Sequence, residues 1–444
     1  YVVTEVHIYL NQTAAIDATK SLSLPLDQIE KIEVIEHDKL RTTVSYILGG
    51  VGITLGVITV AAVIVALTKS SCPFVSTYDG TQYVVQGELF GGATNRRLER
   101  LDYVPLRMQP INGEYQLRIS NELKENQFTN FADLLVIEHD SSMHVGVGTD
   151  GHIYQLGSGL TPTAALVNNK TDVLKEIIQS DGVICKFNDT ASSTATNEMA
   201  MTFPNPGGFK NAKLVLDLKN SYWFDYLYGE FTSHFGSSYD RWQEQQNTQP
   251  VEQMIRWTNE QEIPLSVSMS TPDGWKEICK ITTVGPLANR QIVIPVEIAA
   301  QSTRPIRIKL STGFMFWELD CASMDFSVQQ PLDVSILKPY SAIDENGNDV
   351  LDRLRQDDDK FLTQLEIGNY ATLKYKMTRA TNPAKSYSVV LATKGYYEPV
   401  RNYSGNPDLD FLKRFKEPGA MGNFSKYQYQ SIIRNQKVIA LKSN

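Results

Sequence analysis

The run Ala212-Lys-Leu-Val-Leu-Asp-Leu218 decides the fold class, because short runs of this kind recur between residues 198 and 328. The runs are rich in strand-forming residues, and Pro272-Asp273-Gly274 marks a tight turn between two of them. Short strands at near-regular spacing predict a β-sandwich or jelly roll over residues 196–330. The other strands are expected at Leu265–Met269, Trp275–Thr282, Gln291–Val296, Ile306–Leu310 and Phe316–Phe326.

On either side of this domain the chain also reads as β structure. Asp79-Gly80, Asn112-Gly113 and Asp150-Gly151 are hairpin turns between strand formers, and they predict a β-rich domain with hairpins over residues 69–195. Further strands indicate a C-terminal β segment with a polar tail over residues 331–444. A small N-terminal β unit is expected over residues 1–43, and a helix-permissive insertion over residues 221–262.

Between Thr42 and Thr68 the chain carries no charged residue. About 20 apolar residues suffice to cross a bilayer, so we predict a transmembrane helix over residues 44–68, in contact with membrane lipid. A buried core helix and a signal-peptide core are the alternatives. Three glycines on one face of this helix, with a small-x-x-x-small pattern, predict packing against a partner helix; they are Gly49, Gly52 and Gly56.

Composition and cysteine usage narrow the class of function. The net charge of −8 argues against nucleic acid as a partner, because phosphates require a basic surface. None of the cysteines lies in a C-x-x-C pair, so no metal site is expected. Export would permit a disulfide among Cys185, Cys279 and Cys321, and buried free thiols are the alternative.

Two further motifs bear on ligand binding. Gly146-Val-Gly148-Thr-Asp-Gly151 is followed by a strand rather than a helix, so no nucleotide cofactor is expected. The run from Asp344 to Asp349 starts like a calcium loop but lacks the glycine and glutamate of an EF-hand. A looser surface calcium site and a solvated acidic loop stay open as readings of this run.

The block that follows Cys72 has a distinctive composition: Cys72-Pro-Phe-Val-Ser-Thr-Tyr-Asp79-Gly80-x-x-Tyr83, then Gly87-Glu88-Leu-Phe-Gly91-Gly92-Ala93, Leu98-Glu-Arg100-x-Asp102-Tyr103 and Tyr115-x-Leu-x-Ile-x-Asn121-Glu122. It resembles an uncharacterised family of envelope proteins common in Bacteroidetes, many of which look like lipoproteins. The resemblance covers residues 20–140 well and implies location in the cell envelope. It implies no catalytic residues.

Aromatic residues of the insertion offer a second functional reading. Four of them could contact a glycan, with core packing as the alternative: Trp223, Tyr226, Tyr228 and Trp242. Thr190 lies in an Asp-Thr-aliphatic context in a polar stretch and is a candidate for O-glycosylation.

The sequence thus predicts a mainly β protein: a small N-terminal β unit, one transmembrane helix, and then β-sandwich or jelly-roll-like domains. We expect a non-enzymatic, membrane-anchored subunit of a cell-envelope complex, with other envelope membrane proteins as partners. Its large domain would be periplasmic or on the cell surface. The alternative is a glycan-binding surface protein, and an enzyme is the least favoured reading.

Overall fold

The computed structural model describes residues 3–10, 29–36, 73–299, 302–377 and 382–442. The chain forms two compact units, Tyr1–Leu67 and Thr68–Asn444. In the first unit, β1 (Val3–Leu10) pairs antiparallel with β2 (Ile29–Glu36). Everything described below belongs to the second unit.

The predicted fold class included a transmembrane helix, and this part of the prediction is wrong for the residues that the structure describes. Among the described residues, no helix is long and apolar enough to cross a membrane. The segment 44–68, with Gly49, Gly52 and Gly56, lies outside the described residues.

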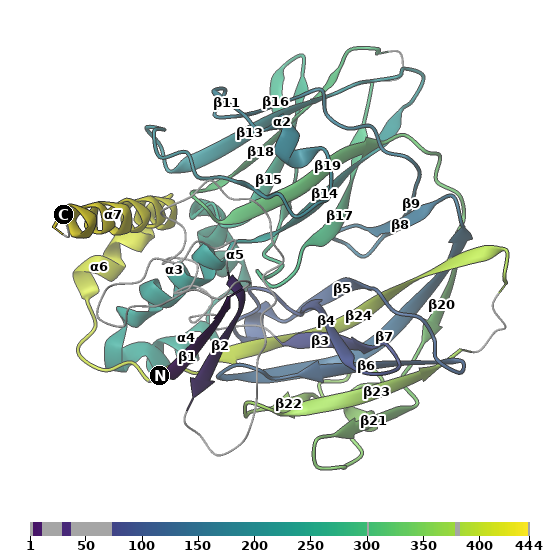
Figure 1. Ribbon diagram of the computed structural model, residues 1–444, viewed down its shortest axis with the longest axis horizontal. Coiled ribbons are helices and arrows are strands. Elements are labelled where there is room, and N and C mark those ends of the chain that lie inside the picture. The colour runs from purple at the N-terminus through teal and green to yellow at the C-terminus, as the bar shows by residue number, and fades with distance from the viewer. Residues whose placement is uncertain (1–2, 11–28, 37–72, 300–301, 378–381, 443–444) are drawn as a thin grey trace. The chain divides into compact units, whose positions relative to one another are not determined.

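Two β-sandwiches make up the second unit (Figure 1). The first sandwich consists of two sheets. One sheet has the strand order β20-β7-β24-β5, and β22 also pairs with β7. The other sheet has the strand order β21-β23-β6-β3-β4. Alternate residues of both sheets face a shared core that includes Val75, Leu117, Leu134, Leu373 and Leu391. The strands are β3 (Phe74–Tyr78), β4 (Tyr83–Glu88), β5 (Arg100–Leu106), β6 (Glu114–Ser120), β7 (Glu125–Asp140), β20 (Asp333–Leu337), β21 (Ser341–Asp344), β22 (Leu362–Gln364), β23 (Tyr370–Lys376) and β24 (Lys385–Pro399).

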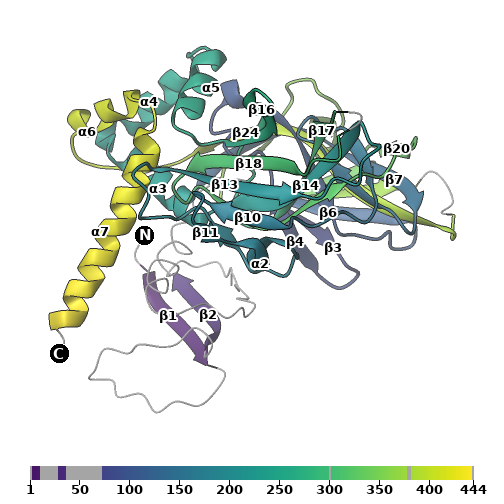
Figure 2. The same cartoon turned by 90° about the horizontal axis from the view of Figure 1, so that it is seen from above.

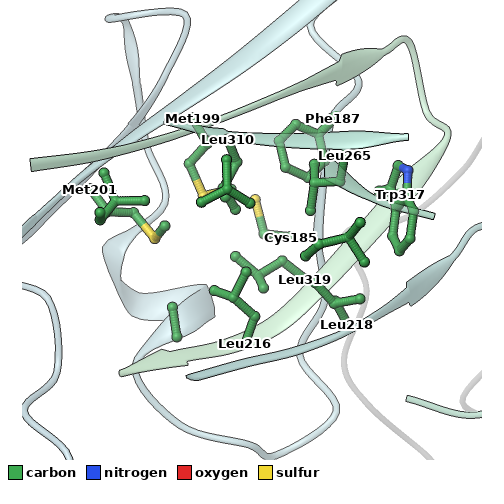
Figure 3. Packing of buried hydrophobic residues seen from close by; sticks show 14 of the residues in the cluster. Cys185, Phe187, Met199, Met201, Leu216, Leu218, Leu265, Leu310, Trp317 and Leu319 are labelled. Carbon is green, nitrogen blue, oxygen red and sulfur yellow. The ribbon is translucent and has the colours of Figure 1, made fainter. Parts of the chain in front are cut away.

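The second sandwich packs a six-stranded sheet, β11-β10-β13-β18-β15-β16, on a four-stranded sheet, β12-β19-β14-β17. Leu216 and Leu319 meet Met199 and Leu310 from the opposite sheet in its core, and Trp317 closes one end of the core (Figure 3). Its strands are β10 (Ala164–Val167), β11 (Thr171–Asp172), β12 (Cys185–Lys186), β13 (Thr196–Phe203), β14 (Asn211–Asn220), β15 (Leu265–Thr271), β16 (Gly274–Ile281), β17 (Arg290–Glu297), β18 (Ile306–Gly313) and β19 (Trp317–Asp325); the short helix α2 is Leu174–Ile177.

The second sandwich is inserted into the first. β7 leaves the first sandwich, the hairpin of β8 (His144–Val147) and β9 (Ile153–Leu156) follows, and the chain returns to the first sandwich at β20. The strands expected in residues 69–195 and in 331–444 therefore share sheets, since β6 pairs with β23 and β7 with β24. The sequence boundaries at 195 and 330 did not reveal this pairing, because local periodicity does not specify the partner strand.

Helices cover one end of the sheets (Figure 2). The insertion 221–262 forms α3 (Tyr222–Ser233), η3 (Gly236–Ser238), α4 (Tyr239–Gln246) and α5 (Val251–Glu260), and Ser221 caps α3 by accepting a hydrogen bond from the Phe224 amide. The tail, expected to be polar, forms α6 (Leu409–Lys413), η5 (Arg414–Lys416) and α7 (Ala420–Lys442). Two single-turn helices, η2 (Arg96–Leu98) and η4 (Leu351–Arg353), complete the elements.

Candidate functional site

An arginine held between two tyrosine rings lies on the outer face of the β21-β23-β6-β3-β4 sheet. The guanidinium carbon of Arg118 is 4.0 Å from the ring centroid of Tyr83 and 3.9 Å from that of Tyr370. The three side chains come from β6, β4 and β23, and all are half-buried. We call this group the Arg118 clamp. Both distances are within the range of favourable cation–π contacts.

Strand alternation puts the clamp on the outer face. On β6, Tyr115, Leu117 and Ile119 are buried in the core, so Gln116 and Arg118 point outward. On β23, Ala371, Leu373 and Tyr375 are buried in the same way, so the residues between them share the outer face with Arg118. Across the sheet, Arg118 lies opposite Ser76 on one side and Thr372 on the other.

A tight turn brings Tyr83 to this face. Tyr78 and Tyr83 are paired across the β3–β4 hairpin, and their ring centroids are 5.3 Å apart. Asp79 closes the turn by accepting hydrogen bonds from the amides of Thr81 and Gln82. The Gln82 bond is the largest cause of the lowered pKa of Asp79, and Gly80 supplies the positive φ of 103°. The hairpin predicted at Asp79-Gly80 is confirmed.

Tyr370 is held by Glu345, which follows β21, the edge strand beside β23. Glu345 accepts hydrogen bonds from the Tyr370 amide, at 3.0 Å, and from the Asn369 side chain, at 2.7 Å. Both carboxylate oxygens of Glu345 are thus used to fix the start of β23. The second ring of the clamp is in this way positioned by a backbone contact rather than by its own hydroxyl.

Arg118 has no anionic partner in the part of the chain that the structure describes. Its Nε atom is buried without a hydrogen-bond acceptor, and no ion pair or hydrogen bond reaches the side chain. Lys374, a diagonal neighbour on β23, is likewise without an ion pair among the described residues. The closest acidic residue of β6 on this face, Glu114, is four positions along the strand and accepts a hydrogen bond from Tyr340.

A second polar cluster joins the two sandwiches. Arg290 of β17 contacts Asp102 of β5 at 2.6 Å and donates to the Glu88 carbonyl oxygen at 2.7 Å. Asp102 also accepts a hydrogen bond from the Phe90 amide, and Arg100 donates to the Thr283 carbonyl oxygen. Although burial raises the pKa of Asp102, the guanidinium groups of Arg290 and Arg100 outweigh it and lower this pKa to about 2.

Glycines allow the sandwiches to approach at this cluster. A Cβ atom on Gly91 would lie 2.8 Å from the Val284 carbonyl carbon, and one on Gly285 would overlap the Glu88 carboxylate. The conspicuous Gly87–Ala93 and Leu98–Tyr103 blocks thus line the junction between the sandwiches. Their composition is explained by packing, and it requires no ligand.

A buried lysine makes a third polar cluster, on the outer side of the four-stranded sheet. Lys213 Nζ donates to Asp325 at 2.8 Å, to both the Ser327 carbonyl and hydroxyl oxygens at 2.9 Å, and to the Gln155 carbonyl oxygen. Asp325 accepts a further bond from the Gly157 amide. Every donor of this ammonium group has an acceptor, so the cluster ties the β9 end to the second sandwich and is structural.

The aromatic residues expected to contact a glycan are mostly used in packing. Trp223 is 5% exposed, and its indole donates to Ser425 of α7 at 2.8 Å, so it offers no ring face to a ligand. Tyr226 contacts Trp223, Tyr228 contacts Phe231, and Trp242 stacks on Phe235 with centroids 4.4 Å apart. For Trp223 the glycan prediction is wrong, because α7 covers it and the sequence does not reveal that contact.

The predicted disulfide is absent. Cys185, Cys279 and Cys321 are free thiols, and Cys72 lies outside the described residues. Cys185 faces the core of the second sandwich, Cys321 is opposite Asp217 on the outer face of the same sheet, and Cys279 is in the other sheet. Burial raises the pKa of each thiol, to about 11 for Cys279 and Cys321. The prediction failed because spacing along the chain does not specify which face of a sheet a cysteine occupies.

Three other predictions concern O-glycosylation at Thr190, the loop at Asp344 and metal binding. Thr190 is exposed in a loop, so its O-glycosylation stays a prediction. Asp344 accepts the amides of Asn346 and Asn348 and so forms a turn. Within the described ranges, no group of three or more His, Cys, Asp or Glu side chains is placed to hold a metal ion.

Sequence reasoning missed both Arg118 and Tyr370. The alternation of Tyr115-x-Leu-x-Ile119 could have placed Arg118 on an outer face, but its ring partners come from separate strands.

Comparison with known proteins adds little. No protein family was found to match the chain, and no curated protein matches it. A solved structure described as "Structure of allantoicase" is similar over 58% of this chain and 91% of that chain, with 10% sequence identity and a TM-score of 0.20. So low a score supports no conclusion about fold, and it neither establishes nor excludes an enzymatic activity.

Proposed function

We propose that the protein is a non-enzymatic binding protein that holds an extended glycan against the outer face of the β21-β23-β6-β3-β4 sheet. The observation that carries the proposal is the Arg118 clamp, in which the arginine is held between two rings and has no hydrogen-bond or ion-pair partner among the described residues. Thr372 and Gln116 lie beside it, and Gln116 donates one hydrogen bond to the Tyr83 hydroxyl, so the face still offers donors and acceptors of hydrogen bonds.

The place of the clamp in the sheet favours a glycan over a peptide strand. β6 lies in the middle of its sheet, with β3 on one side and β23 on the other. Its backbone groups are therefore used within the sheet, and a peptide cannot bind there by strand addition, which needs a free edge. A ligand must be held by side chains alone, and a hydroxyl-rich polymer can bind aromatic rings and polar side chains in this way.

The test is a binding screen of the full chain against a panel of soluble polysaccharides by affinity electrophoresis and calorimetry. We expect Tyr83→Ala and Tyr370→Ala to abolish any binding that the wild-type protein shows. Trp275→Ala is the matched control, because Trp275 is also a partly exposed ring, 40% exposed, that contacts the cations Arg307 and Lys309, but on the second sandwich. Loss of binding in the control alone would move the site to the second sandwich.

A role as a subunit of a protein complex is the second candidate, and one feature favours it. β20 is an edge strand that pairs only with β7 among the described strands, and its Val334 and Ile336 are 36% and 63% exposed. Unpaired edges with apolar side chains are typical of sites for strand addition. Ile336→Lys should then abolish co-purification with a partner, whereas Tyr83→Ala should leave it unchanged. The envelope location implied by the sequence resemblance stays a prediction.

A further inference from the structure

We infer that the Arg118 clamp selects glycans that carry an anionic group, a carboxylate or a sulfate, and that Lys374 provides a second charged contact. The inference rests on the proposed function and specifies its ligand class. It follows from the state of the two cations on this face, neither of which has an ion-pair partner among the described residues, although Glu114 is a diagonal neighbour of Lys374 on β6.

Arg118 is a permanently charged group with unused donors. A guanidinium keeps its charge at every physiological pH and has five N–H donors, and its flat fork matches a carboxylate or sulfate. Here two tyrosine rings cover its faces, at 4.0 and 3.9 Å, and its Nε is buried without an acceptor. The rings hold the fork in one orientation, and its terminal Nη groups, which have no acceptor among the described residues, are the donors that a bidentate anion would meet, whereas the buried Nε is out of reach of a ligand.

Lys374 places a second charge within reach of the same ligand. Arg118 is directly opposite Thr372, so Lys374 is its diagonal neighbour across the β6–β23 pair, at a Cα separation of about 7–8 Å. Gln116 is directly opposite Lys374. An anionic oligosaccharide lying across the two strands would therefore meet two cations.

The local charge contrasts with that of the whole chain. The protein carries a net charge of −8, and yet Arg118 and Lys374 have no carboxylate partner among the described residues. Glu345, the acidic group at Tyr370, is engaged by backbone and side-chain donors, and Glu114 is bonded to Tyr340. A net negative charge repels a polyanion at long range, so binding would depend on local cations such as Arg118 and Lys374.

Matched probes can test the charge requirement. The full chain is titrated with oligogalacturonate and with the fully methyl-esterified form of the same oligomer, and separately with dextran sulfate and dextran. We expect the charged member of at least one pair to bind about tenfold or more tightly than its neutral counterpart. The pair that shows the preference identifies the anion as a carboxylate or a sulfate.

Variants assign the preference to the clamp. Arg118→Gln should remove the difference within the pair, Arg118→Lys should keep part of it, and Lys374→Gln should weaken binding of the charged probe a few-fold. Arg307→Gln is the control, since Arg307 also lies over an aromatic ring, that of Trp275. A preference that survives Arg118→Gln, or disappears in Arg307→Gln, overturns the assignment.

The remaining outcomes separate this inference from the proposed function. Equal binding of charged and neutral probes overturns the inference and leaves the glycan-binding proposal in place, whereas binding of no polysaccharide overturns both. If Arg118→Gln unfolds, as its melting curve would show, the wild-type protein decides. Its affinity for the charged probe must fall with added salt, and an affinity independent of salt overturns the inference.

Discussion

Arg290 and Asp102 form a buried ion pair, 2.6 Å between Nη1 and Oδ1, that connects β17 of the second sandwich to β5 of the first. Their side chains are 9% and 5% exposed. Burial of such a pair is tolerated only when both groups are fully hydrogen-bonded, and here the Glu88 carbonyl oxygen and the Phe90 amide complete the set. The pair is therefore a sensitive point of the junction between the sandwiches.

Loss of one member of this pair should destabilise the protein strongly. Arg290→Met leaves Asp102 buried without its main partner, and we expect a loss of about 3–5 kcal/mol in the free energy of unfolding. Denaturant unfolding followed by tryptophan fluorescence measures it. Lys385→Met, which breaks the exposed pair with Asp140, is the control and should cost less than about 1 kcal/mol. A similar cost for both variants would contradict the role of the junction.

The same ion pair should make the free energy of unfolding decrease as the pH is lowered. The folded-state pKa of Asp102 is lowered from 3.8 to about 2, so its contribution is complete above pH values well over 3.8 and is lost as pH falls toward 2. At about 1.4 kcal/mol for each pKa unit, the contribution is on the order of 2 kcal/mol. Unfolding curves of wild type and Asp102→Asn between pH 6 and 2 should converge on acidification. Parallel curves would disagree with this expectation.

The glycines at the junction should be far less replaceable than other glycines of positive φ. Gly285 has a φ of 94°, and a Cβ there would overlap the Glu88 carboxylate. Gly208 has a φ of 80° and no atom near the corresponding position. We expect Gly208→Ala to cost about 1–2 kcal/mol from the backbone alone, and Gly285→Ala about 3 kcal/mol or more. Thermal melts of the two variants measure the difference, and equal melting temperatures would speak against it.

The thiols should be unreactive in the folded state. Cys185 is 1% exposed, and burial raises its pKa, so it should be alkylated only after unfolding. Cys279 and Cys321 are less buried, but pKa values of about 11 leave little thiolate at pH 8. Timed alkylation followed by peptide mass mapping, under non-reducing conditions, is the measurement. Detection of a disulfide-linked peptide from any two of these cysteines would contradict the structure.

Trp223 should contribute to stability and not to ligand binding. Its indole donates to Ser425, whose hydroxyl in turn donates to the Phe314 carbonyl oxygen at 2.7 Å. Trp223→Ala should cost about 3–5 kcal/mol, and Ser425→Ala about 1–3 kcal/mol, because each leaves buried polar groups or space behind. Neither should change the affinity for a polysaccharide measured below the melting temperature, and a selective loss of binding would restore Trp223 as a ligand contact.

The sequence by itself determined the local elements of the two sandwiches. The six runs expected between residues 198 and 328 are all strands, and Ala212–Leu218 lies within β14. Asn112 and Gly113, with φ of 52° and 82°, form the tight turn that their residue types predict. These features depend on near neighbours in the chain, since period-2 alternation and turn chemistry act over a few residues.

Only the tertiary structure decided which strands pair and which side chains meet. β7 pairs with β24, although all strands of the second sandwich lie between them in the sequence. Arg118 lies between rings from β4 and β23, and Trp223 is covered by α7. Alternation tells which residues share a face of a strand, but the neighbouring strand is chosen by long-range packing. For the same reason the spacing of Cys185, Cys279 and Cys321 along the chain did not establish a disulfide.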